Sequence, residues 1–258
     1  MLKKRVIPIL TFNGSSLIKT KCFSNPRTIG NPIQSARVFN ARNVDELVFI
    51  DITATYEKRK INLDLVKFVI DECFMPVTIG GGISNIDDIK NLLNIGADKI
   101  VLNNAFIQNE EFVRNAIKYF GSQCISASID IEIINEEFYI RNNFNKKIKA
   151  SEFLIYLNEL KVGEIILNSV ENDGTMKGFN LILAEFILDK IHSPIVFVGG
   201  AGKIEDVEDL YKTGYDGDIG ISSLFYYSQF TPNDVKRKMK EIGLPVRFNY
   251  TKIDSKAF

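Results

Sequence analysis

Short runs of apolar residues alternate with helical segments along almost the whole chain. The runs are rich in valine and isoleucine, which is typical of parallel strands that are buried on both faces. We therefore predict eight such strands. They lie at residues 6–10, 47–52, 76–79, 99–102, 124–129, 164–167, 195–198 and 218–221.

The segments between these runs carry the signals of helices. Several place their apolar residues on one face at the 3.6-residue spacing of a helix. Asn31 and Thr231 are each followed by a proline, so each predicts a capped helix start. Ser84 and Asp87 predict a start that resembles a capping box, for a helix that ends near Gly96.

Strand and helix alternate eight times, which favours a (β/α)8 TIM barrel, with a doubly wound open sheet as the alternative. An internal repeat at an offset of 118 residues strengthens the barrel: Glu46 falls on Glu164, Pro76 on Pro194 and Gly82 on Gly200. We expect one barrel over residues 1–247, made of half-barrels 1–120 and 121–247, and a C-terminal tail over 248–258.

The composition narrows the class of protein. The 258 residues include 32 lysines and arginines and 32 acidic residues, and a net charge of zero argues against a protein that coats nucleic acid. No apolar run approaches the length of a membrane span, and the N-terminus lacks the features of a signal peptide. Three widely spaced cysteines and a single histidine, His192, form no metal or redox motif. We expect a cytoplasmic protein without a metal or cofactor, in which His192 is structural or exposed on the surface.

Active sites of such barrels lie where the strands end. Glycine-rich turns follow the predicted strands 76–79 and 195–198, and a polar loop follows the next predicted strand in each half. Such turns let backbone N–H groups approach a phosphate, and two of them in symmetric positions imply a substrate with a phosphate at each end. The predicted phosphate-binding residues are Gly82, Asn103 and Asn104 in one half and Asp173, Gly174, Gly200, Ser222 and Ser223 in the other.

Two carboxylates, Asp51 and Asp130, end hydrophobic strands and are candidates for a general acid or base, although Asp51 is as well suited to capping the next loop. Lys19 belongs to the segment 11–30, which is too long for a simple turn and predicts a mobile lid over the site. At the opposite end, Arg5, Glu46, Lys99 and Glu164 stand at strand starts. They either form a ring of paired charges across the barrel bottom or are ordinary solvated strand ends.

Together these features resemble the HisF family, the cyclase subunit of imidazole glycerol phosphate synthase, over about residues 1–247. The resemblance implies a half-barrel repeat, a substrate with two phosphates (PRFAR), and ammonia that arrives through the barrel from a HisH-type glutaminase at the bottom face. The stretches that carry it are residues 4–8, 45–53, 80–83, 120–124, 173–175, 199–202 and 243–247.

The resemblance also implies roles for single residues. Arg5, Glu46, Lys99 and Glu164 match the family's ammonia gate, and Asp98 matches a position that touches the glutaminase. Lys19 matches a lysine of the lid, and the residues that match the family's phosphate sites are Gly82, Asn103, Asp173, Gly174, Gly200 and Ser223. Asp130 matches the catalytic aspartate at the end of the fifth barrel strand.

Two departures from the family pattern lie at the mouth of the barrel. The second catalytic aspartate of the family falls on Thr11, whose hydroxyl cannot replace a carboxylate as an acid or base near neutral pH. Residues 138–150 lack the family's substrate-contacting loop with two glycines.

We therefore favour a branch of the family associated with amidation of surface-glycan sugars, which the stretch 23–32 resembles. In that branch a HisF-like and a HisH-like protein deliver ammonia to a separate sugar amidotransferase. The alternatives are an authentic cyclase, which forms imidazole glycerol phosphate and AICAR from PRFAR and ammonia, and a phosphate-binding scaffold that regulates its glutaminase allosterically.

Overall fold

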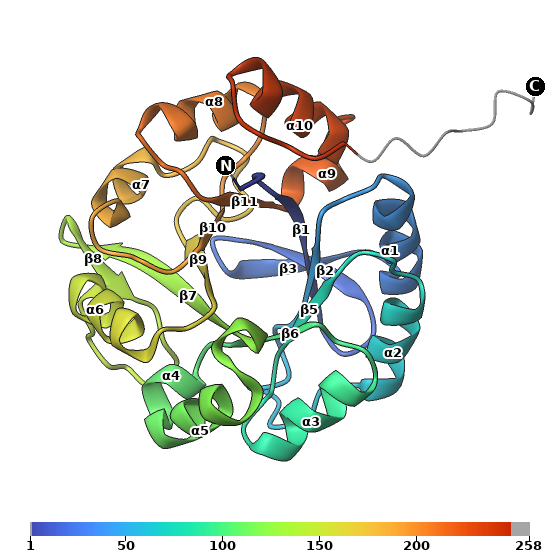
Figure 1. Cartoon of the computed structure of the whole chain (residues 1–258), viewed down its shortest axis with the longest axis vertical. Coiled ribbons are helices and arrows are strands. Elements are labelled where there is room, and N and C mark those ends of the chain that lie inside the picture. The colour runs from blue at the N-terminus through green and yellow to red at the C-terminus, as the bar shows by residue number, and fades with distance from the viewer. Residues whose placement is uncertain (1, 249–258) are drawn as a thin grey trace, which may run out of the picture.

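Eight parallel strands pair in chain order, and pairing of the last with the first closes them into a barrel (Figure 1). The structure is a computed structural model and describes residues 2–248, so residues 249–258 of the expected tail lie outside the described part. The (β/α)8 prediction is confirmed. The barrel strands are β1 (Val6–Phe12), β4 (Leu47–Asp51), β5 (Val77–Gly80), β6 (Lys99–Leu102), β7 (Ile125–Ile134), β9 (Glu164–Ser169), β10 (Ile195–Val198) and β11 (Asp218–Ile221).

Helices surround the barrel and cover its outer face (Figure 1). Their apolar faces and the outward-facing residues of the strands form the larger part of the core. The helices are α1 (Pro32–Ala41), α2 (Leu63–Asp71), α3 (Ile86–Asn94), α4 (Ala105–Gln108), α5 (Glu110–Phe120), α6 (Ala150–Leu160), α7 (Leu181–Ile187), α8 (Glu205–Lys212), α9 (Ser223–Tyr227) and α10 (Pro232–Glu241), with a 3₁₀ turn at Ser122–Cys124.

The predicted helix starts are confirmed in two cases and wrong in a third. Asn31 caps α1, and Thr231 forms a capping box at the start of α10. Helix α3 starts at Ile86 and is instead capped by Asn85, whose side chain accepts from the backbone N–H of Asp88 at 2.9 Å. Ser84 lies outside the helix because its own N–H donates to the carboxylate of Asp88, so Asn85 rather than Ser84 occupies the capping position.

A separate apolar cluster fills the inside of the barrel. It consists of inward-facing valine and isoleucine side chains from alternate positions of the strands, as expected for a packed barrel interior. Its members are Ile7, Ile9, Val48, Val101, Ile166, Val196 and Val198.

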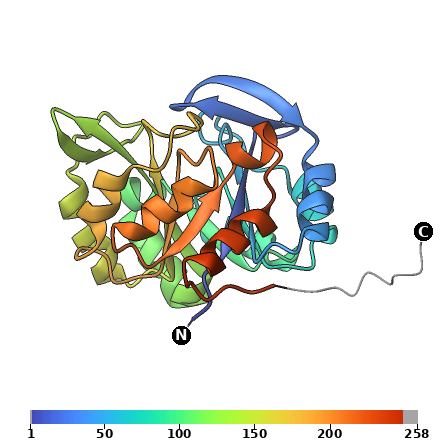
Figure 2. The same cartoon turned by 90° about the horizontal axis from the view of Figure 1, so that it is seen from above.

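The segment predicted as a lid is a β-hairpin rather than an irregular loop. Strands β2 (Leu17–Lys21) and β3 (Ser24–Gly30) pair antiparallel, and β2 continues from the end of β1. The hairpin lies across the end of the barrel where the parallel strands finish (Figure 2). Its inner strand is partly buried and its outer strand is almost fully exposed. A second hairpin extends β7 with the antiparallel strand β8 (Glu137–Ile140).

The 118-residue offset relates equivalent hydrogen bonds in the two parts of the barrel. The Asp88 carboxylate accepts from the N–H of Ser84 at 2.9 Å, and the Asp206 carboxylate accepts from the N–H of Gly202 at 2.8 Å. These bonds hold the turns that follow β5 and β10. They agree with the division into half-barrels 1–120 and 121–247, which stays a proposal.

Within residues 2–248, none of the helices combines the length and the apolar character that crossing a membrane requires.

Candidate functional site

The bottom of the barrel, where the strands begin, is closed by charged side chains that meet on the axis. Arg5 donates to Glu46 at 2.6 Å, to Asp218 at 2.7 Å and to Glu164. Lys99 lies 2.9 Å from Glu46 and 3.4 Å from Glu164. The four residues that the sequence placed at strand starts are therefore brought together as one network, and the solvated alternative is wrong.

Asp218 is a fifth member of this network, which we call the charge ring. This residue was not predicted from the sequence. Its carboxylate accepts from the Arg5 side chain and also from the Arg5 backbone N–H at 2.6 Å. Its position as the first residue of the last barrel strand was a usable signal, because the other ring members also stand at strand starts. With three carboxylates against two cations, the ring carries a formal charge of −1.

Electrostatic pairing in the ring is strong because Glu46 and Glu164 are buried. Burial disfavours the charge on Arg5, but the carboxylates of Glu164, Asp218 and Glu46 outweigh it and raise the pKa of Arg5 above its usual value. The hydroxyl of Thr78 also donates to Glu46, at 2.6 Å. Removing one partner of such a set leaves a buried charge unpaired.

Asp98 lies at the same end of the barrel, with an exposed side chain. One of its carboxylate oxygens accepts from the backbone N–H of Val77 at 2.8 Å and so supports the start of β5. A contact between Asp98 and a glutaminase stays a proposal.

At the mouth, where the strands end, Asp130 is the candidate acid or base. It lies near the C-terminal end of the parallel part of β7 and accepts from the side-chain amide of Asn103 at 2.8 Å. Removal from water raises the pKa of Asp130 to about 6, and the neighbouring charge of Asp173 adds to the rise. A carboxyl with this pKa can give up or take a proton near neutral pH.

Thr11 stands at the end of β1, and its hydroxyl is already engaged. It donates to the backbone carbonyl of Ile18 at 2.5 Å and so ties the barrel wall to the hairpin. The position therefore offers a structural bond rather than a group that could exchange protons with a substrate.

Lys19 points from β2 into the mouth and is only 6% exposed. Burial lowers the pKa of Lys19, while the nearby carboxylate of Asp173 opposes the change. Burial also raises the pKa of Asp173, which accepts from the hydroxyl of Thr20 at 3.3 Å. The sequence assigned Lys19 to a lid and Asp173 to a phosphate site, and the structure brings the two near enough to interact electrostatically.

The tip of the hairpin is anchored on the opposite side of the mouth. The backbone N–H of Cys22 donates to the carbonyl of Asp173 at 2.8 Å. The guanidinium of Arg141 lies 5.3 Å from the centre of the Phe23 ring, within cation–π range. Arg141 belongs to the segment 138–150, so both departures from the family pattern contact the hairpin.

One of the two predicted phosphate sites coincides with a small pocket at the mouth. Asp173, Gly174, Gly200, Ser222 and Ser223 all line it. Gly200 has a φ of +106°, and a Cβ there would stand 2.0 Å from the carbonyl oxygen of Gly178, so only glycine fits. The Ser222 hydroxyl is committed to the carbonyl of Ile9 at 2.5 Å.

The other predicted phosphate site is less open. Gly82 packs closely against the backbone of Arg59, and Asn103 already donates to Asp130. Asn104 precedes the single-turn helix α4 and makes no capping bond with its side chain. Phosphate binding at either site stays a proposal.

Asp51 is a structural residue, in agreement with the alternative that it caps the loop after its strand. It pairs with Arg59 through both carboxylate oxygens, at 2.6 and 2.9 Å, and accepts from the N–H groups of Thr53 and Ala54. A carboxylate that is 2% exposed and engaged in this way holds the loop after β4 rather than a substrate.

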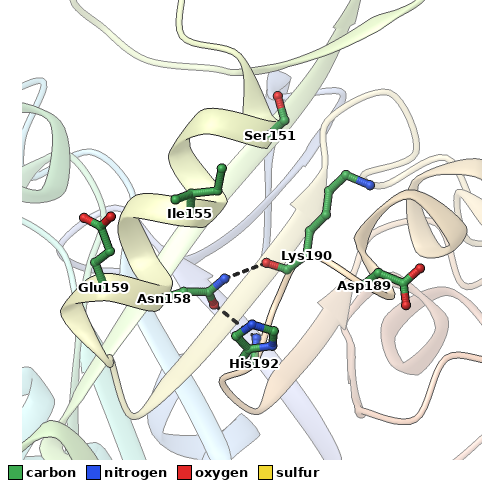
Figure 3. A pocket seen from close by; sticks show the side chains of 7 residues that line it. All are labelled: Ser151, Ile155, Asn158, Glu159, Asp189, Lys190 and His192. Atoms are coloured by element: carbon green, nitrogen blue, oxygen red, sulfur yellow. Dashed lines mark hydrogen bonds between the residues drawn. The ribbon is translucent and has the colours of Figure 1, made fainter.

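His192 lies away from the mouth, on the outer wall of the barrel. It lines a wide surface groove of about 540 Å³ between α6 and the turn after α7 (Figure 3). Its backbone N–H donates to the Asn158 side chain at 3.1 Å, and the same side chain donates to the carbonyl of Lys190 at 2.7 Å. Within residues 2–248 no group of three or more His, Cys, Asp or Glu side chains is arranged to hold a metal ion.

Comparisons with known proteins agree with this geometry. A family model described as histidine biosynthesis protein matches residues 5–231. The imidazole glycerol phosphate synthase subunit HisF of Thermococcus onnurineus (strain NA1) is 38% identical over 253 residues, which cover 97% of this chain and 100% of that protein.

The raised pKa of Asp130 predicts a pH dependence of stability. The folded protein keeps this proton at pH values where the unfolded chain has lost it, so the free energy of unfolding falls as pH rises from about 4 to about 6, by up to about 3 kcal/mol. Urea unfolding across this range checks it. Asp130→Asn removes this part of the fall, whereas Asp64→Asn, at an exposed position of α2, keeps it. Parallel curves for wild type and Asp130→Asn would contradict the assignment.

The Thr11 bond predicts that a carboxylate at this position loosens the hairpin. In Thr11→Asp the ionised side chain cannot donate to Ile18 and repels its carbonyl, which costs about 1–3 kcal/mol of local stability. Amide hydrogen exchange over residues 17–30 is expected to accelerate. Thr11→Ser keeps the donor and serves as the matched control. Equal protection in the Asp and Ser variants would show that the bond does not hold the hairpin.

Proposed function

We propose that this chain, which belongs to the histidine biosynthesis protein family and is HisF-like along nearly its whole length, is the synthase subunit of a glutamine amidotransferase complex. Ammonia reaches it from a HisH-type glutaminase at the bottom face, passes along the barrel axis and is used at the mouth.

The charge ring carries this proposal. It lies across the barrel axis at the bottom, and directly above it begins the apolar interior cluster that contains Val48, Val101 and Ile166. A neutral molecule as small as ammonia crosses such an interior at low cost, whereas ions meet a large desolvation penalty.

The bottom face also offers apolar surface to a partner. Phe74 is 93% exposed just before the start of β5, and Leu2 is 89% exposed before β1. Aromatic residues such as Phe74 are enriched in protein interfaces. Together with the exposed Asp98, they support a glutaminase docked over the charge ring.

The mouth supports a weakened cyclase. Asp130, with its pKa near 6, supplies one acid or base, but Thr11 supplies none because its hydroxyl is bound to Ile18. Cyclisation that needs two such groups is slowed when one is missing. We infer that the acceptor of ammonia is a surface-glycan sugar, handled with a separate sugar amidotransferase; the non-acidic residue at position 11 and the resemblance of residues 23–32 support this branch.

An authentic cyclase subunit is the second candidate. The observation that favours it is the identity of 38% with a HisF subunit over 97% of this chain. Asp130, Asn103 and Lys19 all stand at the mouth in this structure, so part of the site for PRFAR would be in place.

An assay of the purified protein with PRFAR and an ammonium salt separates the two candidates. Because general acid–base catalysis contributes about 10²- to 10⁴-fold, we expect turnover to be lower than that of a HisF enzyme by about this factor. A HisF enzyme under the same conditions is the positive control. Turnover equal to that control would overturn the weakened cyclase and establish the second candidate.

Breaking the charge ring tests the passage of ammonia. Arg5→Ala leaves three buried or partly buried carboxylates with only Lys99 as a cation, which distorts the ring. In complex with the glutaminase, we expect product formation from glutamine to fall severalfold, while product formation from an ammonium salt is retained.

Arg37→Ala is the matched control, since Arg37 pairs with Glu72 on the outer helices and the change removes an exposed arginine. Equal losses with glutamine and with ammonium in Arg5→Ala would count against a passage through the ring.

A further inference from the structure

A buried hydroxyl inside the barrel has no hydrogen-bond partner. Ser126 on β7 is 1% exposed, and its Oγ is among the buried side-chain atoms of the described residues that make no hydrogen bond. An unpaired polar atom in a protein interior lowers stability, so native structures rarely keep one without a reason.

The pairing of the strands fixes where this hydroxyl points. Ser126 is in register with Glu164 on one neighbouring strand and with Val101 on the other. Partners in adjacent parallel strands point to the same face. Glu164 belongs to the charge ring and Val101 to the apolar interior, so the Ser126 side chain points into the barrel where the ring ends and the apolar interior begins.

The neighbouring hydroxyl of Thr78 shows that a buried hydroxyl in this part of the interior can find a partner. Thr78 is also fully buried in the interior, and it donates to Glu46 at 2.6 Å. Its proton is therefore committed to the charge ring. The Ser126 hydroxyl, by contrast, keeps both its proton and its lone pairs available.

We propose that Ser126 Oγ is a resting site for ammonia immediately above the charge ring. A hydroxyl donates to the nitrogen lone pair of ammonia and also accepts one of its protons. The valine and isoleucine side chains around it offer no competing partner, so the molecule is held by few bonds and can move on. The formal charge of −1 on the ring also keeps anions from following ammonia into the barrel.

This assignment rests on the proposed function, and it makes Ser126 a positioning residue for ammonia rather than a catalytic one. Water is the competing occupant. A water molecule held in a protein interior needs two to four polar partners. The strand neighbours of Ser126 are Val101 on one side and Glu164, which is already paired, on the other. They therefore offer a water molecule few partners.

A pair of isosteric variants tests the hydroxyl at equal side-chain volume. Ser126→Thr and Ser126→Val add the same extra bulk, but only the threonine keeps the hydroxyl. Without ammonia, we expect the melting temperature of Ser126→Val to exceed that of Ser126→Thr by roughly 2–4 °C, because the valine leaves no polar atom unpaired. A threonine variant that is equally or more stable would show that the hydroxyl is paired in the folded protein, and would overturn the proposal.

Ammonia itself is the probe for binding. Melting temperatures are measured at about pH 9.5 in ammonium chloride, where much of the ammonium is deprotonated, and in tetramethylammonium chloride at equal ionic strength. We expect ammonia to raise the melting temperature of wild type and Ser126→Thr by about 1–2 °C and to leave Ser126→Val unshifted. Equal shifts in the two variants, or no shift in wild type, would mean that only water occupies the site and would overturn the proposal.

A competition assay in the complex separates failure of this site from failure of the proposed function. The complex receives glutamine labelled with ¹⁵N in its amide together with unlabelled ammonium. The proposal expects a smaller share of labelled product in Ser126→Val than in Ser126→Thr. Equal shares would overturn a role for Ser126 in transfer. Absence of labelled product in wild type would overturn the passage of ammonia itself, while the melting experiments still decide whether Ser126 binds ammonia.

Discussion

Five charged side chains meet on the barrel axis, and the need to pair them organises the bottom of the molecule. Burying carboxylates such as Glu46 and Glu164 costs several kcal/mol each unless a cation and hydrogen bonds compensate. The planar guanidinium of Arg5 provides donors in several directions at once, so one residue contacts carboxylates at the starts of β4, β9 and β11. These contacts join residues 41, 159 and 213 positions apart along the chain. Lys99 completes the pairing from β6.

Burial also removes charged groups from water at the mouth of the barrel, but there it shifts their pKa values. There the β2–β3 hairpin covers the ends of the strands, and the groups beneath it are less completely paired. Burial raises the pKa of Asp130 to about 6 and lowers that of Lys19. The bottom therefore holds its charges in one paired network, while the mouth keeps in Asp130 a carboxyl that can change protonation near neutral pH. Between the two lies an apolar interior with a single buried serine hydroxyl at its lower boundary.

The two departures from the family pattern act on one element. Thr11 holds the base of the hairpin through the carbonyl of Ile18, and Arg141 contacts its tip at Phe23. In the sequence these departures are 130 residues apart and look unrelated. In the structure both favour a hairpin that stays over the mouth. The hydroxyl of Thr11 thus supplies a bond to the hairpin that an ionised carboxylate at this position could not donate.

The sequence by itself determined the barrel, the order of its strands, the starts of α1 and α10 and four members of the charge ring. These features follow from local rules: short buried strands, helical periodicity and charges at strand starts. Only the tertiary structure showed that Asp218 joins the ring, that Arg59 takes Asp51 away from the mouth, and that Lys19 interacts electrostatically with Asp173. It also showed that Ser126 has no partner. Each of these depends on which side chains from distant segments meet, and on how much water is left between them. A one-dimensional pattern does not contain that information, because the free energy of a buried polar group is set by its neighbours in space rather than by those along the chain.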